Sequence, residues 1–168
     1  MQCDLVAFEQ LYVDCFERAY AIALRLVNDR HTAEDIASES LARAFASWGQ
    51  IAQLPYRELW VLRVASNLAR DHVRRRRRRQ VITLRFRAHW LSEEQPSTAA
   101  EVHDDLRRAL GGLPKRQLQA VMLCRYAGFT EAEVATALGV SKGTVNTHVQ
   151  RGLLALRTGL ADAEGWAW

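Results

Sequence analysis

The sequence has few cysteines and no long apolar run, and both absences narrow the class of protein. Of its 168 residues only three are cysteines, Cys3, Cys15 and Cys124, which are scattered and odd in number. That pattern argues against a disulfide framework and favours a reducing compartment. No apolar stretch approaches the ~20 residues of a membrane span, and the first residues lack the pattern of a signal peptide. We therefore expect a cytoplasmic protein without a membrane span.

The chain also lacks the residue patterns of a metal site or a catalytic centre. Its five histidines show no ligand spacing with cysteines or carboxylates. It has no phosphate-binding loop and no nucleophile–base pair. We therefore expect no cofactor and no enzyme activity. The apolar alternation typical of strands is missing too, and no segment repeats, so the sequence predicts an all-α fold.

The positive charge is concentrated in one segment. Residues 56–79 contain nine arginines against Glu58 and Asp71, a net charge of +7, whereas the whole chain carries +4. The segment ends in an unbroken run, Arg74–Arg79. A basic tail or a non-specific patch would explain the run alone. Its place at the end of an amphipathic helix instead favours a surface that meets a phosphate backbone.

Helical periodicity dominates the N-terminal half. Apolar residues recur at three- and four-residue steps over 8–26, which predicts a long first helix. Thr32 begins a capping signal for a second amphipathic helix, which we expect Gly49 to end. Residues 50–54 are expected to form a loop, with Pro55 at the entry to a third helix.

The third helix has two different faces. At about 100° per residue, four polar residues fall on one stripe, and the opposite arc is apolar. One face can bury against the first two helices while the other presents arginines and an amide. Because the stripe continues into the arginine run, a DNA-facing surface is a better interpretation than a solvated face. The stripe consists of Arg63, Asn67, Arg70 and Arg74.

The segment after the arginine run changes character. It contains Pro96 and acidic residues and shows no sustained period, which predicts a linker. Its apolar residues indicate that part of it packs on the protein or on a partner. The predicted division of the chain is a domain at 1–79, a linker at 80–101, a domain at 102–160 and a short tail at 161–168.

The C-terminal domain has the spacing of a helix-turn-helix. Thr130 and Glu133 form a capping box, and Gly139 can adopt the left-handed conformation that a tight turn needs. Val145 and Leu153 are expected on the face between the helices. An ordinary helical hairpin is the alternative. The outward positions suit base edges and phosphates in a major groove; they are Lys142, Gly143, Thr144, Asn146, Thr147, Gln150 and Arg151.

Three stretches together resemble one family, the extracytoplasmic-function sigma factors of the bacterial sigma-70 superfamily. Residues 32–45 resemble the core-polymerase-binding helix, 60–74 the helix that reads the promoter's minus-ten element, and 113–157 the minus-thirty-five-binding domain. The order of the motifs is more specific than any one of them. Ser38 and Ser66 depart from the pattern, which commonly has glutamine and arginine there.

The resemblance implies two helical domains, sigma region 2 and sigma region 4, and a role in promoter-specific transcription initiation. The implied partners are promoter DNA, an anti-sigma factor, and core RNA polymerase at its beta-prime clamp helices and beta flap. Asp35, Ile36 and Glu39 would bind the clamp helices. Tyr56 and Trp60 are candidates for base stacking, with Trp48 favoured for the core. The residues assigned to the minus-ten element are Tyr56, Trp60, Arg63, Asn67, Arg70, Arg74, Arg75, Arg76, Arg77, Arg78 and Arg79, and the outward helix-turn-helix residues are assigned to the minus-thirty-five element.

Two other classes of protein stay open. A stand-alone helix-turn-helix regulator would usually dimerise and bind a palindrome without polymerase, yet the sequence has no clear dimerisation helix. An adaptor that sequesters polymerase or a regulator would not need the arginine–asparagine stripe. The aromatic tail, with Trp166 and Trp168, fits either packing on the protein or binding a partner.

Overall fold

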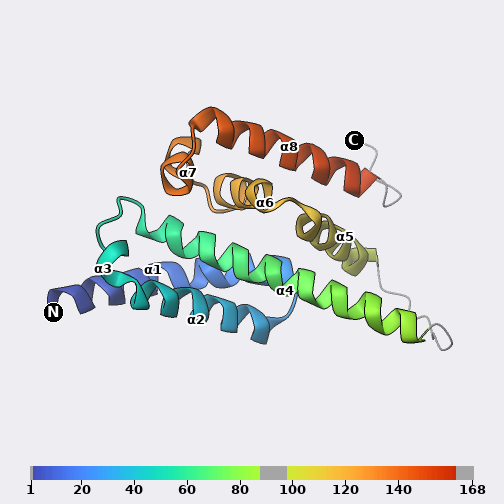
Figure 1. The fold of residues 1–168 in the computed structure, drawn as a ribbon, viewed down its shortest axis with the longest axis horizontal. Coiled ribbons are helices and arrows are strands. Elements are labelled where there is room, and N and C mark those ends of the chain that lie inside the picture. The colour runs from blue at the N-terminus through green and yellow to red at the C-terminus, as the bar shows by residue number, and fades with distance from the viewer. Residues whose placement is uncertain (1, 88–97, 162–168) are drawn as a thin grey trace.

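The computed structural model describes residues 2–87 and 98–161, with side chains described at 5–79 and 105–160. Within these ranges every regular element is a helix (Figure 1), which confirms the all-α prediction. None of the helices in the described part of the chain is both long and apolar enough to cross a membrane. Of the predicted tail at 161–168, Ala161 is the last residue of a helix, and 162–168 lie outside the described residues.

Three long helices form the N-terminal half. They are α1 (Gln2–Val27), α2 (Arg30–Ala46) and α4 (Arg57–Arg87), and a single turn, α3 (Trp48–Ile51), joins the second to the third. Their apolar faces meet in one core, where each large buried side chain contributes about 1.5–3 kcal/mol. The largest fully buried side chains here are Ile22, Leu26, Leu41, Ile51, Leu59 and Leu62.

Asp29, not Thr32, caps the second helix. Asn28 has a positive φ of 53°, which turns the chain so that Asp29 Oδ1 accepts the Thr32 backbone N–H at 2.8 Å. Hydrogen bonding from the Thr32 side chain, and then from its backbone N–H, lowers the pKa of Asp29. The predicted end of the helix at Gly49 is also wrong, because α2 ends at Ala46 and Gly49 lies within α3.

Helix α4, which the sequence predicted as the third helix, extends beyond the arginine run. It continues to Arg87, and α5 (Thr98–Gly112) begins at Thr98. Both helices therefore enter the predicted linker at 80–101. The remainder of that linker, 88–97, lies outside the described residues, and the domain boundaries stay a prediction.

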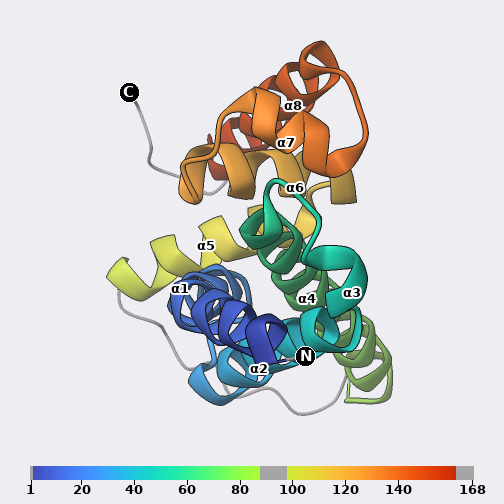
Figure 2. The same ribbon diagram turned by 90° about the vertical axis from the view of Figure 1, so that its left-hand side faces the viewer.

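The C-terminal half packs α5, α6 (Lys115–Val121) and α8 (Lys142–Ala161) together, and its buried apolar residues belong to the same hydrophobic cluster as those of the N-terminal half. A π-helical turn, η1 (Met122–Tyr126), extends α6, and α7 (Glu131–Leu138) precedes α8. Both views show α6, α7 and α8 over α4, with α8 outermost, and Figure 2 shows α5 next to α1 (Figures 1 and 2).

The helix-turn-helix forms as predicted at its turn. The Thr130 backbone N–H donates to Glu133 Oε2 at 2.7 Å, and the Glu133 N–H donates to Thr130 Oγ1 at 3.3 Å, which completes the capping box. Gly139 is left-handed, with φ 65°. Val145 is fully buried between the two helices.

One predicted core position of α8 is wrong. Leu153 is 38% exposed, whereas Gly152 is buried. A Cβ added at Gly152 would lie 2.7 Å from Val121 Cγ2, so α8 crosses α6 at a distance that only glycine permits. The helix turns its Val149–Gly152–Leu156 face inward, and this rotation moves Leu153 toward solvent.

We expect Gly152→Ala to lower the free energy of unfolding by about 1–3 kcal/mol, because the added methyl group overpacks the contact with Val121. The better helix propensity of alanine, about 1 kcal/mol, offsets part of this cost. Urea denaturation followed by circular dichroism measures the change. Gly159→Ala on the same helix is the control, since its Cβ would lie at an ordinary 3.6 Å from Ala109 Cβ. Equal free energies of unfolding for the two variants would contradict the close contact between α8 and α6 at Gly152.

Candidate nucleic-acid interface

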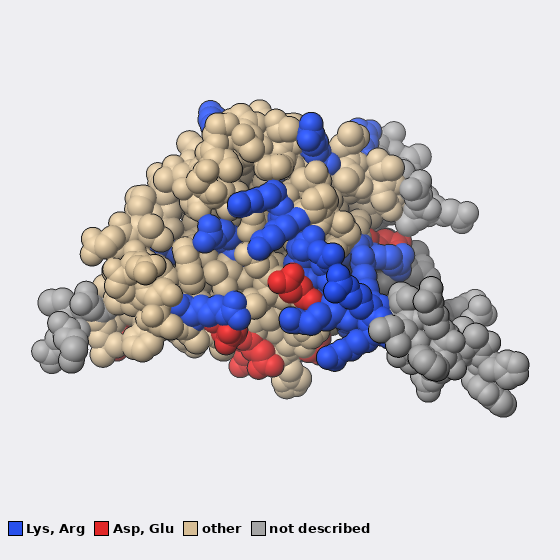
Figure 3. Space-filling model, in the orientation of Figure 1, with Lys and Arg blue, Asp and Glu red and all other residues tan. Residues whose placement is uncertain are grey.

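The arginine run forms an exposed positive surface along the second half of α4. Five of its six residues are exposed, and Arg77 is half-buried, donating from Nη2 to the Arg108 carbonyl at 2.5 Å. Lys and Arg side chains gather over this part of the helix in Figure 3. Burial lowers the pKa of the neighbouring His72, and Arg75 and Arg76 lower it further. The surface therefore favours an anionic ligand.

The polar stripe before the run turns into the molecule. Arg63 Nη1 donates to the Ala137 carbonyl at 3.0 Å, and Arg70 Nε donates to the Leu113 carbonyl at 3.2 Å. Between them, Asn67 Oδ1 accepts a hydrogen bond from Gln119 Nε2 at 2.9 Å. Of the four stripe residues, only Arg74 is exposed. The expectation that one face of this helix presents the whole stripe is therefore wrong for this conformation, because the C-terminal helices cover it.

Burial makes the charged form of both covered arginines less favourable, which lowers their pKa values. Loss of solvent lowers the pKa of Arg63, and the nearby Arg116 lowers it further. Loss of solvent and then Arg74 lower the pKa of Arg70. Among the described residues Arg70 approaches only the Asp71 carboxylate, at 3.9 Å, and Arg63 has no carboxylate partner. Main-chain carbonyls are thus the main acceptors for these two cations.

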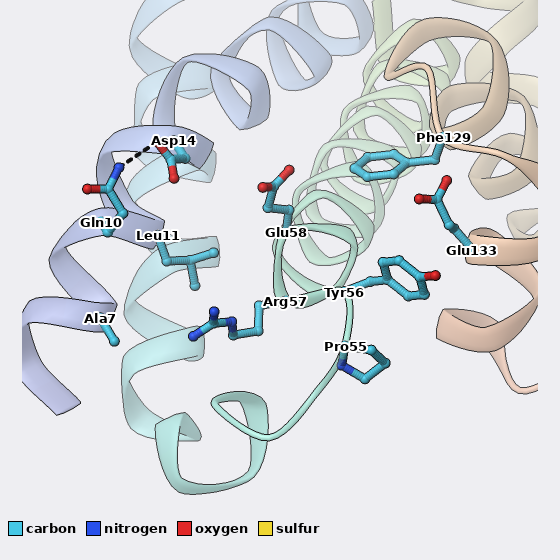
Figure 4. A pocket seen from close by; sticks show the side chains of 10 residues that line it. All are labelled: Ala7, Gln10, Leu11, Asp14, Pro55, Tyr56, Arg57, Glu58, Phe129 and Glu133. Atoms are coloured by element: carbon cyan, nitrogen blue, oxygen red, sulfur yellow. Dashed lines mark hydrogen bonds between the residues drawn. The ribbon is translucent and has the colours of Figure 1, made fainter. Parts of the chain in front are cut away.

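A cleft of about 430 Å³ opens at the head of α4 (Figure 4). Tyr56 and Glu58 line it from one side, and Phe129 and Glu133 line it from the C-terminal half. Tyr56 is 36% exposed and Trp60 is half-buried. A planar ring such as a base could enter here and meet the Tyr56 ring.

Trp48 belongs to the core, as favoured above. Its ring packs edge-on against Phe8, with centroids 5.3 Å apart, and the Arg57 guanidinium lies 5.9 Å from its centroid. Its buried Nε1 has no hydrogen-bond partner among the described residues. Trp48 is therefore not available to stack on a base.

The predicted polymerase-docking residues separate into two groups. Asp35 and Glu39 are exposed on α2, whereas Ile36 is 7% exposed and packs in the core. Glu39 pairs with Arg43 at 2.7 Å, one turn on. Exposed pairs of this kind contribute at most about 1 kcal/mol, so a partner can displace Arg43. Of the three predicted docking residues, the two carboxylates are therefore accessible to a partner, whereas Ile36 is not.

The outward residues of α8 are exposed, as predicted, with one exception. Thr144 is half-buried, and its backbone N–H donates to Ser141 Oγ at 3.1 Å. Ser141 thus caps α8. The exposed residues are Lys142, Gly143, Asn146, Thr147, Gln150 and Arg151.

Gln119 and Arg18 hold the two halves together, and the sequence patterns did not single them out. Gln119 is only 2% exposed. Arg18 pairs with Glu58, donates to the Ala127 carbonyl at 3.0 Å and lies over the Phe129 ring. A polar amide within the apolar face of a short helix was the available signal for Gln119. No local sequence pattern indicates the role of Arg18, because its partners in the C-terminal half lie over a hundred positions away in the chain.

Known protein families match both halves of the chain. Residues 11–79 match the model of sigma-70 region 2, and residues 103–156 match the model of sigma-70 region 4. These matches define a two-part sigma-70 protein. Hereafter the two matched segments are called region 2 and region 4.

Curated relatives narrow this class. The chain is 34% identical over 165 residues to the ECF RNA polymerase sigma factor SigE of Mycolicibacterium smegmatis, covering 95% of this chain and 64% of that protein. It is 32% identical over 147 residues to SigL of Mycobacterium tuberculosis, covering 83% and 81%. It is also 32% identical over 157 residues to the RNA polymerase sigma-E factor of Streptomyces coelicolor, covering 92% and 86%. The chain belongs to the extracytoplasmic-function (ECF) RNA polymerase sigma factors, which confirms the resemblance.

Solved structures share the fold. The sigma factor RpoE of Bartonella quintana, solved with the anti-sigma factor NepR, has a TM-score of 0.59 at 21% identity, covering 92% of this chain and 97% of that one. CnrH, solved with the cytosolic domain of CnrY, has a TM-score of 0.64 at 21% identity, covering 96% and 91%.

We expect the triple variant Arg75→Gln, Arg76→Gln and Arg78→Gln to bind duplex DNA of arbitrary sequence more weakly and with a flatter salt dependence. The slope of log K against log salt should fall in magnitude by about 0.9 for each phosphate that the variant no longer neutralises. Fluorescence anisotropy at several salt concentrations measures it.

The control removes the same charge elsewhere, through Arg30→Gln, Arg125→Gln and Arg157→Gln, three exposed residues outside the run. If both triple variants flatten the slope equally, net charge and not the arginine run governs the binding.

Proposed function

We propose that this chain binds core RNA polymerase and directs it to promoters, with region 2 at the minus-ten element and region 4 at the minus-thirty-five element. The observation that carries the proposal is the presence of both regions, in that order, on a chain that belongs to the ECF sigma factors. The protein itself would catalyse nothing and would act in the cytoplasm, since the polymerase supplies the chemistry. The alternative of a stand-alone regulator is not favoured, because such a protein has no need of region 2.

The docking surface for polymerase would be the exposed face of α2. Asp35 and Glu39 lie one turn apart and both reach solvent. Paired carboxylates suit a basic helical partner such as the clamp helices, where charge complementarity speeds association and fixes register.

Contact with the minus-ten element would combine reading and anchoring. Tyr56 at the cleft would stack on a base flipped from the non-template strand, with Trp60 beside it, and stacking would offset a flipping cost of a few kcal/mol. The Asn67 amide would read a base edge, and Arg63, Arg70 and the arginine run would bind phosphates.

The minus-thirty-five element would be bound by the N-terminal half of α8. Asn146 and Gln150 carry amides that suit adenine edges in the major groove, and Lys142 and Arg151 suit phosphates or guanine. All four are exposed. We also infer an anti-sigma partner, because the sigma factor RpoE, which has the same fold, is solved in complex with an anti-sigma factor, and CnrH, also of this fold, is solved with the cytosolic domain of CnrY.

We expect Asp35→Lys combined with Glu39→Lys to abolish binding to core RNA polymerase, because both carboxylates become like charges facing a basic partner. Pull-down and surface plasmon resonance with core enzyme measure the affinity. Glu9→Lys combined with Glu17→Lys is the matched control, since both residues are exposed on α1. If the α2 variant keeps its helicity and binds core RNA polymerase with unchanged affinity, Asp35 and Glu39 do not form the docking surface.

We expect Asn67→Ala to reduce run-off transcription from a cognate promoter by about 10-fold or more and to relax the preference at one minus-ten base. Removing an amide–base pair costs about 1–3 kcal/mol of discrimination. The assay should use preformed holoenzyme, since the variant also removes the hydrogen bond with Gln119 in the free protein. If transcription instead falls equally for promoters with every base at the minus-ten positions, Asn67 contacts the DNA backbone and not a base edge.

A further inference from the structure

Two arginine side chains from opposite halves of the chain lie close together where α6 packs against α4. Arg63 of region 2 donates from Nη1 to the Ala137 carbonyl at 3.0 Å, and Arg116 of region 4 donates from Nη1 to Gln119 Oε1 at 3.4 Å. Loss of solvent and then the charge of Arg116 lower the pKa of Arg63. Neither guanidinium forms an ion pair with a carboxylate in the described part of the chain. The contact therefore contains an excess of positive charge, and Lys and Arg side chains gather there in Figure 3.

Two amide side chains connect these arginines. Gln119, which is 2% exposed, accepts from Arg116 and donates from Nε2 to Asn67 Oδ1 at 2.9 Å. Asn67 lies one turn beyond Arg63 on the same face of α4. Hydrogen bonds and helix geometry thus join four side chains of the two halves into one group. We call Arg63, Asn67, Arg116 and Gln119 the seam cluster.

The seam cluster has more donors than acceptors. A guanidinium carries five N–H groups, and each arginine of the cluster makes one hydrogen bond within the described residues. The Asn67 oxygen is occupied, whereas its Nδ2 amide donates to no described residue. Solvent reaches the cluster from one side, because Arg116 is exposed and Arg63 and Asn67 are half-buried. A ligand that supplies several acceptor oxygens can therefore enter it.

The charge and the donors together favour a phosphate oxyanion. Two guanidinium groups that approach each other without a counter-charge make each other's charged form less favourable. A phosphate group removes this repulsion, and its oxygens accept the N–H groups in paired, charge-assisted hydrogen bonds. A chloride ion would bring one charge and no oxygens, so it would leave the geometry of the donors unused.

We propose that a phosphate group binds at the seam cluster and bridges Arg63 of region 2 to Arg116 of region 4. The Asn67 amide donates to the same ligand, and Gln119 positions Arg116 and Asn67 through its two hydrogen bonds. Arg116 lies outside both surfaces that are proposed for promoter DNA. The site needs both halves of the chain but neither polymerase nor a promoter, so its failure would be distinct from a failure of the proposed function.

Two sources share this ligand chemistry. One is a free phosphate ion or monoester, and the other is a phosphate of a nucleic-acid backbone that passes over the contact between α4 and α6. In both cases the bound group stabilises the contact between the halves, because a ligand that binds the folded arrangement favours it by mass action.

Calorimetric titration of the full chain with sodium phosphate, at constant ionic strength in chloride, measures the binding. One phosphate should bind per chain, and Arg116→Gln should weaken its affinity by about tenfold or more, because it removes a charge-assisted hydrogen bond. Arg157→Gln is the matched control, since Arg157 is an exposed arginine of region 4 outside the seam cluster. Equal affinity of the wild type and Arg116→Gln, or equal weakening in both variants, would overturn the site.

Charge reversal at Arg116 should increase stability. The carboxylate that Arg116→Glu introduces would pair with Arg63 and take the role of the phosphate. In chloride this variant should melt about 2–4 °C above the wild type, and phosphate should no longer raise its melting temperature specifically. Phosphate also stabilises proteins through its exclusion from their surface, so the response of Arg157→Glu at equal ionic strength is subtracted. If Arg116→Glu melts no higher than Arg157→Glu and keeps the specific phosphate response, the proposal is wrong.

Short duplex DNA of arbitrary sequence distinguishes the two sources. If DNA displaces phosphate from the wild type, and Arg116→Gln lowers the salt slope of DNA binding by about 0.9, a backbone phosphate occupies the site. If the DNA-bound chain still takes up one phosphate, the ligand is a free ion or monoester. Both results support the seam cluster as a phosphate site. A failure of the proposed function would leave phosphate binding intact and would appear only as absent initiation with core polymerase.

Discussion

The hydrogen bonds between region 2 arginines and region 4 helix ends determine how the two halves of this protein fit together. A buried guanidinium needs hydrogen-bond acceptors, because burying the cation without them is costly. Arg63 and Arg70 meet the carbonyls of Ala137 and Leu113. Those carbonyls also need donors, since their helices end there. The contact therefore satisfies both partners, and neither half has to present an ion pair of its own.

This arrangement separates two properties of DNA recognition that lie on one helix. The exposed arginines after Val73 supply charge that does not depend on sequence, whereas Asn67, which is suited to a base edge, is covered by Gln119. In α8, by contrast, both the charged residues Lys142 and Arg151 and the amides Asn146 and Gln150 are exposed. The charge of the arginine run is therefore accessible in this structure, whereas the Asn67 amide is not.

The local parts of this structure could be predicted from sequence, and the contact between its halves could not. The capping box at Thr130 and the left-handed Gly139 depend on residues within a few positions, so their patterns were sufficient. Asp29 caps α2 in place of Thr32 because Asn28 turns the chain before it. The apolar arc of α4 was identified correctly, since periodicity reports which face is buried. Periodicity also predicted that Arg63 and Asn67 face solvent. It distinguishes apolar from polar residues, and it does not reveal when a polar residue is buried against a polar partner.

The contact between the two halves combines polar and apolar parts. Its hydrogen bonds exchange water for protein acceptors at modest net gain, whereas the buried apolar residues of both halves join in one hydrophobic cluster that stabilises the contact. Gly111 adds shape to the contact, because its missing side chain lets α5 approach Val73. Tight shape and directional hydrogen bonds together give a contact that is specific in register. The polar stripe of α4 thus fixes the position of region 4, through partners that come from a distant part of the chain.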